Sequence, residues 1–112
     1  MYSDRVVLCA SSAYEHKYYF NEDFNALPEK VKEELKIMCV LYTEDVGGIL
    51  TLEFDDKGNL LFNVTSKEGD LLFDEIGSDL KIKDIRRKKA ELLESLELFY
   101  RVFFLGEDLN TK

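Results

Sequence analysis

His16 is the only histidine of this 112-residue chain, and Cys9 and Cys39 are its only thiols. A histidine beside a cysteine could form a nucleophile pair, and one beside an acid such as Glu15 could begin a metal site. A thiol hydrolase also needs an oxyanion pocket and an orienting residue, and a metal site needs three or four converging ligands. No spacing in the sequence supplies either set. We therefore expect no catalytic residue, no metal ligand and no cofactor, and a histidine at a strand edge.

Aromatic side chains surround this histidine in the sequence. Tyr14, His16, Tyr18 and Tyr19 could line a pocket, so a small-ligand-binding protein or an enzyme is the alternative function. A deep pocket with converging polar groups would favour that alternative. A solid interior with a large two-fold contact would instead favour a protein that binds other proteins.

Two groups of acidic residues could bind cations. The segment 55–59 (Asp-Asp-Lys-Gly-Asn) places Lys57 where a calcium loop needs an acid, so a hairpin turn explains it better. The residues Asp70, Asp74, Glu75 and Asp79 form a denser cluster, which could bind a divalent cation or a basic partner. A solvated acidic face is the simpler interpretation.

The sharpest polar feature is basic, residues 86–89 (Arg-Arg-Lys-Lys), preceded by Lys81 and Lys83. Consecutive residues point around the whole circumference of a helix, so these cations cannot form one flat patch. The net charge of −8 also disfavours nucleic-acid binding, which depends on excess positive charge. We expect no nucleic-acid partner and a helix whose cations meet the acidic residues 70–79.

The length and composition suit one domain over residues 1–112, with a flexible tail over 106–112. The only apolar run near the start, residues 6–10, is too short for a signal peptide or a membrane span. Two isolated cysteines are then expected to be reduced and buried. These features predict a cytoplasmic protein without a membrane partner.

The first half of the chain predicts strands followed by a helix. Residues 6–8 and the aromatic run 16–20 favour two strands, with a turn at Ser11 and Ser12. A short helix over residues 4–14 is the competing interpretation, which periodicity does not exclude. Apolar residues at helical spacing then predict a helix that starts near Pro28 and ends at Gly47, with an apolar second half covered on several sides.

Three further strands are expected after this helix. Residues 49–55 and 60–65 alternate apolar and polar side chains on either side of the turn at Gly58. Residues 71–76 follow a turn that contains Gly69 and read as the third strand of an antiparallel meander.

The C-terminal run from Ser78 to Gly106 predicts one long amphipathic helix, roughly 40 Å in length. Its start is ambiguous between Asp79 and Asp84, because residues 80–83 alternate as a strand would. A compact domain of this size is only about 35 Å across. The helix should therefore extend beyond its own domain or be shared with a partner.

Near its end this helix is apolar on every side, with seven apolar residues among the eight of 98–105. Exposed apolar surface of this kind usually marks a contact site. We therefore expect a homodimer whose interface includes Phe99, Val102, Phe103 and Phe104. The alternative is that this segment passes between the sheet and the first helix.

Three segments together, residues 14–21, 42–48 and 97–104, resemble a family of small, uncharacterised bacterial proteins. The resemblance extends over nearly the whole chain. It implies no activity and no site residue, because no function is assigned to that family.

These elements predict an α+β fold: a three-stranded antiparallel meander with added N-terminal strands, packed against two helices of which the C-terminal one is long. The expected function is that of an acidic, non-enzymatic protein-interaction module. A chaperone-like adaptor that binds extended segments is a variant suggested only by fold and charge.

Overall fold

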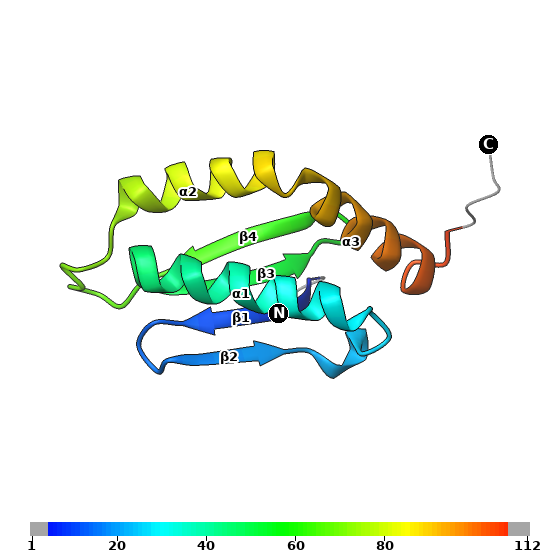
Figure 1. The fold of residues 1–112 in the computed structure, drawn as a ribbon, viewed down its shortest axis with the longest axis horizontal. Helices are drawn as coiled ribbons and strands as arrows, with labels where there is room; N and C mark the ends of the chain where they lie inside the picture. The colour runs from blue at the N-terminus through cyan, green and yellow to red at the C-terminus, as the bar shows by residue number, and fades with distance from the viewer. Residues whose placement is uncertain (1–4, 108–112) are drawn as a thin grey trace.

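Four antiparallel strands form one sheet in the order β2-β1-β3-β4. Of the three helices, one crosses the sheet, one runs along its β4 edge and one lies at its end (Figure 1). The computed structural model describes residues 5–107. The strands are β1 (Val6–Ser12), β2 (Lys17–Phe20), β3 (Ile49–Phe54) and β4 (Leu60–Thr65). The helices are α1 (Glu29–Val46), α2 (Glu75–Lys88) and α3 (Ala90–Phe103), and a short 3-10 turn, η1 (Glu22–Phe24), precedes α1. The predicted α+β class is confirmed, whereas the meander and the number of helices are wrong.

The N-terminal strands are confirmed and the competing helix is wrong. The turn lies later than predicted, since Ser11 and Ser12 belong to β1 and residues 13–16 connect it to β2. His16 adopts a positive φ of 53° in this turn, a conformation that few residues other than glycine tolerate. The register of β1 against β3 shifts between Val7 and Cys9.

Helix α1 has the predicted limits. Pro28 precedes its first turn, and Gly47, at a φ of 84°, ends it. The expectation that its second half is covered on several sides is wrong, because Ile37 and Leu41 are 53% and 55% exposed. The buried side faces the sheet through Leu35, Met38, Cys39, Tyr42, Thr43 and Val46.

The predicted third strand of the meander, residues 71–76, does not form. The Asp70 carboxylate accepts a hydrogen bond from the Leu72 amide at 2.9 Å, which fixes a turn there. The Asp74 carboxylate accepts one from the Gly77 amide at 2.8 Å and caps α2. These two local caps start the helix at Glu75, earlier than either predicted start.

The single long C-terminal helix is also wrong, because the chain bends at Lys89 (φ −109°, ψ 24°) and continues as α3. Figure 1 shows the change of direction between α2, which lies alongside α1, and α3. The Lys89 amine bonds the Glu34 carboxylate of α1 at 2.8 Å. The bend lets α3 return to the sheet, where Tyr100 stacks on Phe54 with ring centroids 4.2 Å apart. A straight helix could not make both contacts.

The core lies between the sheet and the helices, and in the described residues the other face of the sheet carries no helix (Figure 1). Antiparallel sheets tolerate one uncovered face. The fully buried large side chains are Leu8, Phe24, Leu35, Tyr42, Leu50, Leu52, Phe54 and Leu96. Of the tail predicted over residues 106–112, residues 108–112 lie outside the described part of the chain.

Candidate functional site

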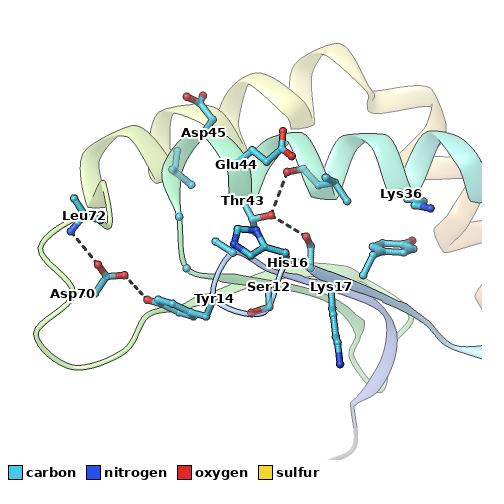
Figure 2. Close-up of a pocket in the computed structure, with 17 residues that line it drawn as sticks. Ser12, Tyr14, His16, Lys17, Lys36, Thr43, Glu44, Asp45, Asp70 and Leu72 are labelled. Atoms are coloured by element: carbon cyan, nitrogen blue, oxygen red, sulfur yellow. Dashed lines mark hydrogen bonds between the residues drawn. The ribbon is translucent and has the colours of Figure 1, made fainter.

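A cavity of about 740 Å³ opens at one end of the sheet (Figure 2). Its walls come from the β1–β2 turn, the last turn of α1 with Gly47 and Gly48, and the loop that contains Asp70 and Leu72. Three of the four predicted pocket residues line it, namely Tyr14, His16 and Tyr18.

Tyr19 is the predicted pocket residue that lies elsewhere. It pairs with Ala10 in the sheet and is 55% exposed, whereas Tyr18 pairs with the buried Ser11. Adjacent residues of a strand point to opposite faces. Strand alternation is therefore the sequence signal that separates Tyr18 from Tyr19.

Tyr14 joins two loops that are distant in the sequence. Its hydroxyl donates to the Asp70 carboxylate and accepts a hydrogen bond from the Lys67 amide at 2.9 Å. The bond to Asp70 raises the pKa of Tyr14 and lowers the pKa of Asp70. Figure 2 shows this chain of contacts running from Tyr14 through Asp70 to Leu72. The role of Tyr14 is thus to hold the cavity wall.

His16 is exposed, and Figure 2 draws its imidazole among the residues of the cavity wall, while the Lys17 side chain extends away from them. Lys36 and Glu44 also line the cavity, so cationic and anionic groups both border it. The arrangement can bind a polar molecule of either charge.

The cavity is bordered on its inner side by hydroxyls, and the two cysteines lie in the core without lining it. The Ser11 and Thr43 hydroxyls are buried and 2.8 Å apart. The Cys9 and Cys39 sulfurs lie 3.8 Å apart, fully buried, and neither residue lines the cavity. The hydrogen bond with Cys9 and burial raise the pKa of the Cys39 thiol, which disfavours the reactive thiolate.

The predicted interface residues have different environments in the structure. Phe99 and Phe104 pack against Phe24, with ring centroids 6.4 Å and 4.6 Å apart. Val102 is half-buried, and Phe103 is 70% exposed. Two of the four predicted interface residues, Phe99 and Phe104, therefore pack against the aromatic core of the chain itself, whereas Phe103 faces outward.

A second exposed apolar group was missed by the sequence analysis. It comprises Leu71 and Leu72, which are 95% and 92% exposed, and Ile76 and Leu80 on the outer side of α2, at 75% and 62%. Assigning residues 71–76 to a strand divided this group between two faces. The four-residue spacing of Leu72, Ile76 and Leu80 is the signal that could have revealed it.

The cations of residues 81–89 bond to acids other than those predicted. The ion pairs that they form are Lys81–Asp45, Arg87–Asp84, Lys88–Asp84 and Lys89–Glu34. None of these acids belongs to the cluster at 70–79, in which Asp70 and Asp74 bind backbone amides instead.

Within residues 5–107, no three His, Cys, Asp or Glu side chains converge as a metal site would require. The Asp55 carboxylate accepts hydrogen bonds from the Lys57 and Asn59 amides, both at 2.9 Å, as in a hairpin turn. Across the same described range, no helix is long and apolar enough to cross a membrane.

The chain matches a described protein family over residues 5–108, and that family is one of unknown function, DUF6145. The chain belongs to this family. The predicted resemblance to an uncharacterised family is therefore confirmed. Comparison with curated proteins finds no match, and comparison with solved structures finds none.

Proposed function

We propose that this member of the DUF6145 family is a single-domain, non-enzymatic, cytoplasmic protein-interaction module that forms a homodimer through the end of α3. The observation that carries the proposal is the number of large apolar side chains that remain exposed. Those more than half exposed are Tyr19, Ile37, Leu41, Leu71, Leu72, Ile76, Leu80 and Phe103. Apolar surface of this extent is typical of contact surfaces.

The end of α3 suits a contact between two copies. Phe99 and Phe104 fix it to the aromatic core, so it needs little ordering on association. Phe103 then points outward, and Leu98 and Leu105 of the same segment are 48% and 40% exposed. Burying one such side chain contributes roughly 1.5–3 kcal/mol, and a two-fold axis doubles each contribution.

The molecular mass in dilute solution, measured by light scattering, tests the dimer. The wild type should have twice the mass of one chain, and Phe103→Asp should give a folded monomer, because Phe103 is not part of the core. Leu72→Asp is the matched control, since Leu72 is 92% exposed but lies away from α3. A wild type that stays monomeric at high micromolar concentration would contradict the proposal.

We also propose that the module acts as a chaperone-like adaptor for extended segments of other proteins. The second exposed apolar group on and before α2 supports this role, because a dimer formed through α3 leaves it uncovered. The net charge of −8 would favour basic clients.

A small-ligand-binding protein is the second candidate. The observation that favours it is the cavity of about 740 Å³ bordered by Tyr14, His16 and Tyr18. Fragment binding followed by NMR tests it, with the ring signals of His16 and Tyr14 as reporters. A ligand that shifts these signals, with no change in molecular mass, would favour this candidate over the interaction module.

A further inference from the structure

Strand β4 is an edge of the sheet, and every second residue along it directs its backbone groups outward. Leu60 shows which residues these are, because its amide donates to the Glu97 carboxylate at 2.8 Å and its carbonyl accepts from Arg86 at 3.4 Å. By alternation, the amides and carbonyls of Phe62 and Val64 also point outward. Within residues 5–107 these four groups make no hydrogen bond.

The two ends of this edge are therefore different. At the Leu60 end, Arg86 and Glu97 occupy the outward groups, and the Arg86 guanidinium lies 4.7 Å from the centre of the Phe62 ring. Charged side chains that cover a sheet edge are a usual protection against unwanted strand pairing. In the described part of the chain, no charged side chain bonds the outward backbone groups of Phe62 and Val64.

The position of helix α2 limits which kind of strand could pair with the β4 edge. Figure 1 shows α2 beyond β4, over the free edge, instead of over the strands of the sheet. A strand added at the usual spacing of about 4.8 Å would lie beneath α2. A second copy in antiparallel pairing would bring its own α2 to the same place, and helices about 10–12 Å in diameter would collide. A single strand that carries no helix of its own would avoid this collision.

The charges around the open end favour a basic strand. Helix α2 runs opposite to β4, since Arg86, near its end, bonds Leu60 at the start of β4 (Figure 1). Its first turns, with Glu75 and Asp79, therefore lie toward the open end of the edge. Both carboxylates are exposed and form no ion pair among the described residues. The chain as a whole carries a net charge of −8.

We propose that the free edge of β4 binds an extended basic peptide segment as a fifth strand, beneath α2. The outward backbone groups of Phe62 and Val64 would hydrogen-bond the segment, and Glu75 and Asp79 would attract its cations. This proposal rests on the adaptor role and not on the homodimer.

The probe is a labelled peptide of about eight alternating Lys and Val residues, a usual strand length, added to the full chain. Binding should be saturable and should slow hydrogen exchange at the Phe62 and Val64 amides, which are free without peptide. The Asn63 amide, which faces β3, should change little. A Glu/Val peptide of the same length should not bind.

Val64→Pro removes an outward amide that the fold does not use, and edge strands tolerate proline at such positions. It should weaken peptide binding about tenfold, whereas Val64→Thr, which keeps the amide, should not. Glu75→Gln combined with Asp79→Asn should also weaken binding at low salt. Unchanged affinity in Val64→Pro would overturn strand addition.

Unprotected Phe62 and Val64 amides in the peptide-bound wild type would overturn it too, and this measurement does not depend on how well the proline variant folds. Equal binding of the Glu/Val peptide would overturn the basic preference. The molecular mass of the same samples reports on the homodimer separately. A sample that is dimeric but does not bind the peptide contradicts strand addition alone, whereas a monomeric sample contradicts the α3 interface.

Discussion

The two ends of the helix layer are closed by different interactions. At the α3 end, stacked aromatic rings fill the space, with Phe24 and Phe104 at 4.6 Å and Phe54 and Tyr100 at 4.2 Å between centroids. At the cavity end, hydroxyls and a carboxylate join the elements, and space remains between them. Burial of apolar rings is driven by a non-directional effect and fills space closely, whereas hydrogen bonds need particular distances and angles and can leave gaps.

The largest expected effect comes from removing a buried aromatic ring at the α3 end. Phe24 is fully buried and touches four other rings, so Phe24→Ala should lower the free energy of unfolding by about 3–5 kcal/mol. Urea unfolding measures it. Leu71→Ala is the control, and it should stay within about 0.5 kcal/mol because Leu71 is 95% exposed and lies away from α3. Equal losses in the two variants would show that the aromatic end is not the main core.

A smaller effect is expected at the cavity end. Tyr42 and Ser78 share a buried hydrogen bond between α1 and α2, and Tyr42→Phe leaves the Ser78 hydroxyl without its partner. The expected loss is about 1–3 kcal/mol in the free energy of unfolding. Adding Ser78→Ala should recover most of it, because no buried polar group then lacks a partner. Additive losses in the double variant would argue against this hydrogen bond.

The bond between Tyr14 and Asp70 should give a local effect that depends on pH. The pKa of Asp70 is lowered in the folded chain, so its contribution is present above the ordinary carboxyl pKa of about 3.9 and is lost as pH falls through the folded pKa. The pKa of Tyr14 is raised, so its contribution is present below about pH 10 and is lost as pH rises through the folded pKa.

Hydrogen exchange at the Lys67 amide should therefore be slow between these two limits and fast outside them. Tyr14→Phe should remove the protection at every pH, without a large change in global stability, because the site is on the surface. Protection that persists in Tyr14→Phe would show that the loop is held by other contacts.

The smallest expected effect is at Cys39, which lies between the two ends. Its thiol is fully buried, and its pKa is raised by the hydrogen bond with Cys9 and by burial. Alkylation of Cys39 in native protein near neutral pH should be negligible, and it should become complete in urea. Rapid alkylation of the native protein would contradict a purely structural thiol.

The candidate site was predictable only in part. Clustering of Tyr14, His16 and Tyr18 within five residues was enough to suggest a shared pocket, and strand alternation excludes Tyr19. The opposite wall could not be predicted. Asp70 lies 56 residues from Tyr14, and no local pattern relates the two.

The sequence by itself determined the local elements. Alternation defined the strands β3 and β4, β-favouring residue types indicated β1 and β2, and Pro28 and Gly47 set the limits of α1, because these signals act over a few neighbouring residues. Tertiary structure decided the bend at Lys89, where contacts to Glu34 on one side and the stack of Tyr100 on Phe54 on the other require two directions. It also contributed to the conformation of residues 71–76, where the Asp74 amide donates to the distant Val46 carbonyl at 3.1 Å in addition to the local turns at Asp70 and Asp74. The contacts of Lys89, Tyr100 and the Asp74 amide join residues far apart in the chain, and local periodicity does not encode such contacts.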